Sequence, residues 1–233
     1  MNTNEKLNVK LFSAVASSDL SAAKSLIKDG ADLNARAEGG WTPLMAAIEC
    51  GALEIAKFLV EIGADVNVAA EIRHTTALII AARYKEPEIV RILISKGANV
   101  NASETDGTTA LLWSAEKGDI ETARILVKSG AELDAMDKNI DFTPLMWAVN
   151  TQNIEMAKML IQSGASVNAA TTYGRTPLMW AAQKNFIGIA RLLIENGADS
   201  GATDNRGRDA VGFAEAEGNI EMAKMLNAAL GKK

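Results

Sequence analysis

The chain has 233 residues, a formal net charge of −5 and 48% hydrophobic residues, values that are typical of a folded globular protein. This acidic balance argues against a general nucleic-acid binder, which needs a basic face to neutralise phosphates. The single cysteine, Cys50, and the single histidine, His74, exclude an intramolecular disulfide, a cysteine-based zinc site and most histidine-dependent catalysis.

The N-terminal part of the chain has no feature of a membrane or export segment. The first twenty residues include Glu5 and Asp19 and contain no long apolar run, so they do not resemble a secretory signal. Nowhere does the sequence reach the roughly eighteen consecutive apolar residues that a membrane span requires. We therefore expect a cytoplasmic protein with no membrane contact.

The next segment predicts two short helices. Thr42 is a natural N-cap, and the proline that follows it suits the first helical position, where a backbone N–H is not needed. This pattern predicts a helix over residues 43–50. A second helix is expected over residues 53–62, where apolar residues recur at helical spacing, and Gly63 supplies the left-handed position that ends it.

This helix pair is repeated along the chain. Thr-Pro-Leu, or a variant of it, recurs every 33 or 34 residues, and a Gly-Ala pair recurs in phase with it. Extrapolation by one period towards the N-terminus places a further, degenerate unit around residues 11–30, so that seven units fill the chain. The Thr-Pro-Leu markers begin at Thr42, Thr76, Thr109, Thr143, Thr176 and Asp209, and the Gly-Ala pairs begin at Gly30, Gly63, Gly97, Gly130, Gly164 and Gly197.

The period and the Thr-Pro-Leu phrase resemble the ankyrin repeat, whose signature is T-P-L-H-x-A over 33 residues. The resemblance implies an all-α solenoid of about seven helix-turn-helix repeats, with 14 helices and short β-turn fingers, in a single domain. The signature histidine is replaced in every unit, so the hydrogen bonds that it makes in the family must be absent or replaced. The expected units are a capping repeat at 1–37, full repeats at 38–71, 72–104, 105–138, 139–171 and 172–204, and a capping repeat at 205–233.

Two of the units have 34 residues, and the extra residue falls in the finger. In both units the position two before the N-cap, which is glycine elsewhere, holds His74 or Asp141. Both residue types tolerate a left-handed backbone better than most others. We therefore interpret His74 as a turn residue and not as a ligand or a base, since nothing near it completes a site.

Helical periodicity separates a buried face from a solvent face on the first helix of each unit. When positions are counted from the N-cap, the second, fifth and sixth lie together and carry apolar or small residues. The fourth position, N4, points the other way, and polar residues flank it. It is therefore predicted to be the centre of the solvent face. In chain order it holds Ala46, Ile80, Trp113, Trp147, Trp180 and Phe213.

Three consecutive tryptophans on a polar face form an exposed apolar row of the kind that marks interaction sites. By the resemblance, the first helices and the fingers line a concave groove where partners dock. Acidic finger residues, Glu104, Asp106, Asp137 and Asp141, would favour basic segments of a partner at the N-terminal side. The predicted partner-binding residues are Trp113, Trp147, Trp180, Trp41, Phe142, Tyr84, Phe213, Lys117, Lys184 and Arg175.

The spacing of the tryptophans constrains a ligand. Three of them span about 20 Å at the packing distance of neighbouring helices. An extended peptide advances about 3.3 Å per residue, so one tryptophan would meet a ligand side chain at roughly every third residue. The predicted function is a non-enzymatic interaction module, monomeric on its own, that binds a partner protein or an extended peptide.

Two other interpretations stay open at this point. In the first, the chain is a structural stack or a module within a larger assembly, because an indole can lie over the next repeat for stability alone. Alternatively, a nucleotide base could stack on Trp147 or Trp180 beside Lys184. The sequence has no Ser-His-Asp set, Walker loop, HExxH or CxxC, so neither an enzyme nor a cofactor is expected.

Overall fold

The computed structural model describes residues 3–231, which form fourteen α-helices and one 3₁₀ helix, η1 (Glu38–Gly40). The odd-numbered helices are α1 (Thr3–Ala16), α3 (Pro43–Glu49), α5 (Ala77–Arg83), α7 (Ala110–Lys117), α9 (Pro144–Asn150), α11 (Pro177–Gln183) and α13 (Ala210–Ala216). The even-numbered helices are α2 (Leu20–Lys28), α4 (Leu53–Glu61), α6 (Pro87–Ser95), α8 (Ile120–Lys128), α10 (Ile154–Gln162), α12 (Ile187–Glu195) and α14 (Ile220–Ala229).

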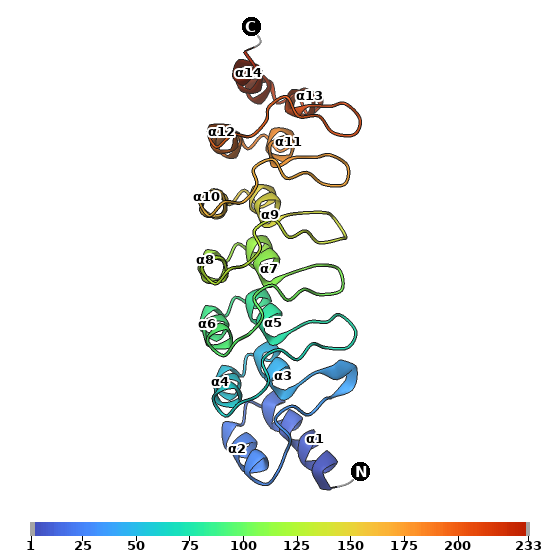
Figure 1. Ribbon diagram of the computed structural model, residues 1–233, viewed down its shortest axis with the longest axis vertical. Coiled ribbons are helices and arrows are strands. Elements are labelled where there is room, and N and C mark those ends of the chain that lie inside the picture. The colour runs from blue at the N-terminus through green and yellow to red at the C-terminus, as the bar shows by residue number, and fades with distance from the viewer. Residues whose placement is uncertain (1–2, 232–233) are drawn as a thin grey trace.

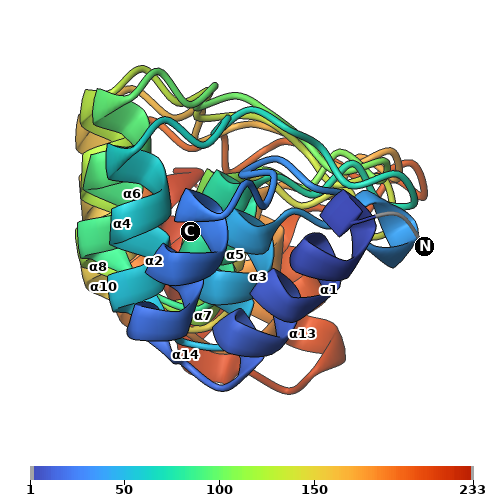
Figure 2. The ribbon, with the colours of Figure 1, turned by 90° about the horizontal axis from the view of Figure 1, so that it is seen from below.

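The helices stack as seven antiparallel pairs along one axis. Figure 1 shows the odd-numbered helices in one column and the even-numbered helices in another, with a finger-like loop leaving each junction on the odd-numbered side. Figure 2, viewed along the stack, shows the fingers projecting away from both columns. The predicted all-α solenoid is therefore confirmed. No helix within residues 3–231 is long and apolar enough to cross a membrane.

The N-cap threonines start the inner, odd-numbered helices as the sequence predicts. The Thr42 hydroxyl accepts a hydrogen bond from the backbone N–H of Met45 at 3.3 Å. The side chain of Asp209, which replaces threonine in the last unit, accepts one from Gly212 at 2.8 Å. Each cap satisfies one of the backbone donors that a helix start leaves free, which is worth about 1 kcal/mol. Because these helices are short, the caps set where each one begins.

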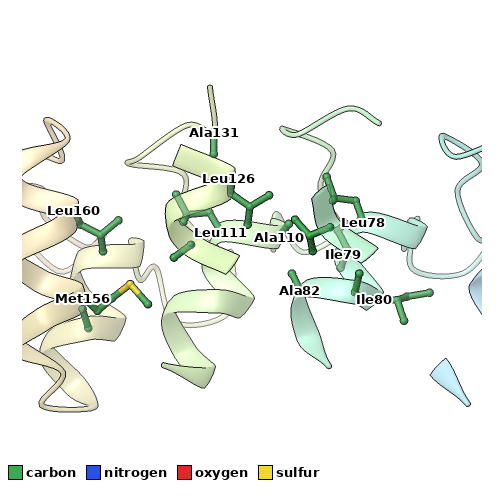
Figure 3. Close-up of a cluster of buried hydrophobic side chains, with 14 of the residues drawn as sticks. Leu78, Ile79, Ile80, Ala82, Ala110, Leu111, Leu126, Ala131, Met156 and Leu160 are labelled. Carbon is green, nitrogen blue, oxygen red and sulfur yellow. The ribbon is translucent and has the colours of Figure 1, made fainter. Parts of the chain in front are cut away.

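The core is one continuous apolar layer between the two columns. On α3 the second, fifth and sixth positions from the cap, Leu44, Ala47 and Ile48, are buried as periodicity predicts, and Pro43 and Met45 are buried with them. Small residues at the fifth and sixth positions let neighbouring helices approach closely, while each large side chain contributes about 1.5–3 kcal/mol on burial. Figure 3 shows the same arrangement further along the stack, where Leu111 and Leu126 come from the two helices of one pair.

The fingers turn through left-handed residues. His74 has a φ of 56° and Asp141 a φ of 57°, while Gly107 and Gly174 occupy the same position with φ values of 87° and 78°. The interpretation of His74 as a turn residue is thus supported by its backbone. Gly107 has a second requirement, because a Cβ there would lie 2.8 Å from the carbonyl oxygen of Met136 in the next finger, whereas Gly207 has no neighbour within 4 Å of a Cβ.

Backbone and asparagine contacts tie successive repeats together. The N–H of Thr105 donates to the carbonyl of Arg73 in the preceding finger at 2.9 Å. Near the other end of the loops, Asn67 accepts from the N–H of Asn99 at 2.8 Å and donates to the carbonyl of Gly97 at 2.9 Å. These bonds hold the spacing between repeats and so hold the groove side of the stack in register.

Candidate functional site: the aromatic ladder

The N4 side chains lie along the inner helices on the side where the fingers leave, and we call Trp113, Trp147 and Trp180 the aromatic ladder. All three are half-buried. The expectation that every N4 residue is exposed is wrong for Ile80, which is 0% exposed, and for Phe213, which is 3% exposed. The N4 positions therefore face a surface that other side chains partly cover.

The covering side chains come from the residue just before each N-cap, which we call the finger-base residue. Phe142 is the finger-base residue of the fifth unit, and its ring centroid lies 5.3 Å from that of Trp147 and 5.1 Å from that of Trp180, edge to face with both. Phe142 is only 6% exposed. The prediction that it flanks an open surface is wrong, because its ring fills the slot between two neighbouring ladder rings.

Arg175, the finger-base residue of the sixth unit, fills the next slot. Its guanidinium carbon lies 3.5 Å from the ring centroid of Trp180 and 4.5 Å from that of Phe213, and it donates a hydrogen bond to the side-chain oxygen of Gln183. Burial lowers the pKa of Arg175, and the positive charge of Arg208 lowers it further, while Asp204 opposes the shift. The guanidinium is thus engaged inside the protein and is not free to neutralise a partner's acidic flank.

The last finger continues the same pattern. The guanidinium carbon of Arg208 lies 4.3 Å from the ring centroid of Phe213, and Asp204 holds it with hydrogen bonds of 2.9 and 3.1 Å. Asp204 also accepts from the backbone N–H groups of Arg206 and Arg208, which closes the turn. From Trp147 to Arg208, N4 rings and finger-base side chains therefore alternate in an unbroken series of contacts.

The slot between Trp113 and Trp147 is different, because its finger-base residue is Thr108. A hollow of about 210 Å³ lies there, between the two ladder rings and the neighbouring fingers. Thr108 and Glu116 line it from the fourth unit. The hollow is further lined by Arg73, Asp106, Leu112, Asp137, Asn139 and Ile140.

The charged groups around Trp113 are mutually paired. Lys117 lies 5.2 Å from the ring centroid of Trp113 and forms an ion pair of 3.1 Å with Glu116. Arg83, from the preceding unit, lies 5.6 Å from the same centroid and forms an ion pair of 3.7 Å with Glu49. Exposed pairs of this kind contribute about 0–1 kcal/mol, so a ligand can exchange them at little cost.

The remaining predicted residues lie at the edges of the ladder. Tyr84 is 46% exposed, and its hydroxyl is 3.4 Å from Glu49. Trp41 is half-buried near the N-terminal end, and Lys184 is exposed beside Trp180. Tyr84 and Lys184 are therefore accessible, whereas the ladder rings are accessible only in part.

The acidic finger residues do not form an open negative surface. Glu104 and Asp137 are buried, and Asp137 accepts hydrogen bonds from the backbone N–H groups of Asn139 and Ile140. The Asp106 carboxylate has a lowered pKa: burial would raise it, but the donors of Thr108 and the charge of Arg73 outweigh that effect. Most of these carboxylates thus stabilise the fingers from within. The prediction that they attract basic segments of a partner is wrong for Glu104 and Asp137, because both are buried.

Comparison with known proteins agrees with this architecture. The family model described as ankyrin repeats in three copies matches residues 8–70, 78–171 and 145–232, which together make up most of the chain. The chain belongs to the ankyrin-repeat family. Ankyrin repeats generally mediate protein–protein interaction, so the family gives the class of function without naming a partner.

Solved ankyrin structures resemble the whole stack. The crystal structure of the ankyrin repeat domain of Bcl-3, described as a unique member of the IkappaB protein family, superimposes with a TM-score of 0.81 at 27% identity. The alignment covers 92% of this chain and 97% of that one. Because 638 chains of known structure match, the ankyrin fold alone selects no partner. No curated protein matches the chain significantly.

The ankyrin geometry also bears on nucleotide stacking. Trp180 is already contacted by Arg175 and by Phe142, and Trp147 by Phe142. A base beside Lys184 would therefore have to displace Arg175 from the Trp180 ring, and no observation in the described part of the chain favours this alternative.

Sequence reasoning missed the role of the finger-base residues. In chain order two small residues, Thr75 and Thr108, stand between large ones; the series is Trp41, Thr75, Thr108, Phe142, Arg175 and Arg208. Their register was visible in the sequence, but their side-chain direction depends on how each finger leaves its helix. The open slot could have been found by comparing each finger-base residue with the N4 residue five positions later, because Thr108 is the one small residue that precedes a ladder tryptophan.

Proposed function

We propose that this ankyrin stack is a non-enzymatic interaction module, which binds an extended segment of a partner protein along the aromatic ladder. The observation that carries the proposal is that Trp113, Trp147 and Trp180 remain partly exposed in a row, although every other large N4 residue is buried. Large amphipathic rings that stay partly accessible on a rigid surface are the residues that most often dominate binding energy.

The ladder sits on rigid elements, which favours binding. Its tryptophans come from three successive inner helices, whose spacing is held by the core and by hydrogen bonds between the fingers. A pre-organised surface loses little conformational entropy when it binds. An extended peptide of about seven residues matches the roughly 20 Å length of the ladder, with anchoring side chains about three residues apart.

The proposal places the protein in the cytoplasm as a monomer. Its support is compositional: a chain with one cysteine, Cys50, has no intramolecular disulfide of the kind that small secreted domains commonly carry.

A peptide-display selection tests the proposal. Wild-type protein is the target, and a Trp113/Trp147/Trp180→Ala triple variant is the counter-target, with both compared at matched thermal stability. A second triple variant, Ile62/Ile154/Ile220→Ala, removes exposed apolar side chains from the even-numbered column and serves as the matched control. We expect enriched peptides with anchors about three residues apart that bind the control variant but not the ladder variant.

Either of two results contradicts this proposal. If no peptide is enriched, the ladder belongs to the structural stack, which is the alternative interpretation. If enriched peptides still bind the ladder variant and lose binding to the control variant, the partner surface lies on the even-numbered column instead.

A further inference from the structure

The slots of the ladder can be compared with one another, because each repeat places its N4 residue and its finger-base residue at equivalent positions. Each slot lies between two successive N4 residues and is closed by the finger-base residue of the first. Phe142 closes the slot between Trp147 and Trp180, and Arg175 closes the slot between Trp180 and Phe213. The slot between Trp113 and Trp147 has only Thr108, and the hollow of about 210 Å³ is what remains.

The groups that receive Arg175 have counterparts around the open slot. Gln183, which accepts a hydrogen bond from Arg175, is the seventh residue from its N-cap, and Glu116 holds that position in the fourth unit. Asp204, the buried acid of the finger beside Arg175, binds Arg208 and acts on Arg175 only through its charge, and Asp137 is the buried acid of the finger beside the open slot. The open slot therefore has the acceptor position that binds a guanidinium two repeats later, with the carboxylate of Glu116 in place of the amide of Gln183.

Charge favours a cation over an aromatic ring in this slot. Its immediate lining includes the carboxylates of Asp106, Glu116 and Asp137 and one cation, Arg73, while Lys117 and Arg83 lie near the Trp113 ring outside this lining. Arg73 is itself engaged, since its guanidinium lies 3.1 Å from Glu104 and 3.6 Å from Asp106. By contrast, the slot that Phe142 fills has the neutral Asn150 at the position of Glu116.

Lys117 does not close the slot to a second cation. It occupies the same helix position as Lys184, and in the sixth unit an exposed Lys184 coexists with Arg175 in the adjacent slot. The ion pair between Lys117 and Glu116 is partly exposed, so an incoming guanidinium can share or replace it at little cost.

We infer that the slot between Trp113 and Trp147 binds an arginine side chain of the partner, stacked on Trp113 and paired with Glu116. The inference rests on the proposed function, because it supplies the specificity of one anchor of the bound peptide. The arginine takes the place that Arg175 takes two repeats later. A planar guanidinium suits this position because it can stack on an indole and donate to a carboxylate at the same time.

The test uses N-acetyl-L-arginine amide as the probe, with the citrulline and phenylalanine analogues as controls. Citrulline keeps the planar shape and removes the charge, while phenylalanine keeps a planar ring. The readout is the indole N–H resonance of each of the four tryptophans in two-dimensional NMR, assigned with single Trp→Phe variants. We expect the signals of Trp113 and Trp147 to shift with a dissociation constant on the order of millimolar. The citrulline analogue is expected to bind about tenfold more weakly or not at all.

Reciprocal variants locate the binding. Thr108→Arg fills the slot with a side chain of the protein itself and is expected to abolish the shifts. Thr108→Phe, which copies Phe142, is the substitute variant if Thr108→Arg does not fold, and it is expected to abolish them too. Arg175→Thr opens the slot two repeats later and is expected to add a probe-dependent shift at Trp180. Glu116→Gln is expected to weaken the probe about threefold or more, with the circular dichroism spectrum unchanged.

The inference is overturned if the citrulline or phenylalanine analogue shifts the signals as strongly as arginine does. It is also overturned if the shifts persist when Thr108 is replaced, or if none occurs at the highest soluble concentration of the probe. This experiment uses no partner. A probe that binds while peptide selection fails therefore refutes the proposed function alone, and ladder peptides that show no arginine preference refute the inference alone.

Discussion

Arg175 links the last two N4 rings, Trp180 and Phe213, by contacting both of them. It stacks on Trp180 at 3.5 Å and on Phe213 at 4.5 Å, and it donates to Gln183. Burial lowers its pKa, so keeping the charge there is opposed by desolvation and is sustained by the ring faces and the acceptor. A residue with this role is expected to affect stability more than an exposed arginine does.

Arg175→Ala should lower the free energy of unfolding by about 1–2 kcal/mol, because it removes two partly buried cation–π contacts and a hydrogen bond. Arg175→Lys should recover only part of this, since an ammonium group cannot stack as a plane. Denaturant unfolding measures the effect, with the exposed Arg124→Ala as a control expected to change stability by less than about 0.5 kcal/mol. Equal losses for Arg175→Ala and Arg124→Ala would show that the stacking does not contribute.

Asp204 gives the last finger a dependence on pH. The backbone N–H of Arg208 is the largest cause that lowers its pKa; burial opposes this, and the Arg208 side chain and the Arg206 N–H add to it. A lowered pKa in the folded state stabilises the protein above the unfolded value of about 3.9, and this stabilisation is lost as the pH falls through the folded value.

Unfolding curves between about pH 5 and pH 2 should therefore show a steeper loss of stability for the wild type than for Asp204→Asn. The two proteins should converge at the acid end, where Asp204 is protonated. Thermal unfolding followed by circular dichroism measures this difference. Parallel curves across the whole range would mean that Asp204 titrates alike in the folded and unfolded chain.

At the scale of the elements, periodicity in the sequence was enough to predict the helices, but it was not enough to predict which side chains are exposed between them. The N-cap Thr42 and the buried face of α3 follow from spacing along one helix, and the structure confirms both. The exposure of Phe142 and of Phe213 depends on how a finger folds across the next repeat. That direction is set by tertiary packing, so helix geometry alone predicted those two residues wrongly.

Gly107 in a finger and Gly130, which follows the C-terminal end of α8, allow the effect of a left-handed backbone to be separated from that of a close neighbour. Gly107 and Gly130 have nearly the same φ, 87° and 88°, but only Gly107 has a neighbour in the way of a Cβ. Gly130→Ala should cost about 1 kcal/mol for the left-handed backbone alone. Gly107→Ala should cost more, because the added methyl group meets the carbonyl of Met136, whereas His74→Gly should be neutral or stabilising by up to about 1 kcal/mol.

Denaturant unfolding of the three variants gives the comparison. An equal cost for Gly107→Ala and Gly130→Ala would show that the next finger moves away freely, so that the fingers are not held in register. That result would also weaken the slot between Trp113 and Trp147, because Asp137 and Asn139 of the next finger form one of its walls.

For the whole molecule, stability depends on neighbours along a single axis. Each inner helix packs against the inner helices before and after it, whereas α1 and α13 have such a neighbour on one side only. In stacks of this kind, stability is approximately a sum of repeat terms and interface terms. The open slot lies between α7 and α9, in the middle of the stack, where both walls have neighbours on both sides.

Amide hydrogen exchange should therefore be slowest in α5 to α10 and fastest in the first and last helix pairs, because opening from an end breaks one interface instead of two. A bound arginine-containing peptide should slow exchange further in α7 and α9 and leave α1 and α14 unchanged. Mass spectrometry after exchange measures both effects. Uniform exchange along the chain would show that the stack opens as one cooperative unit. In that case ligand binding at the central slot would protect the terminal helices as strongly as the central ones, which contradicts the local picture.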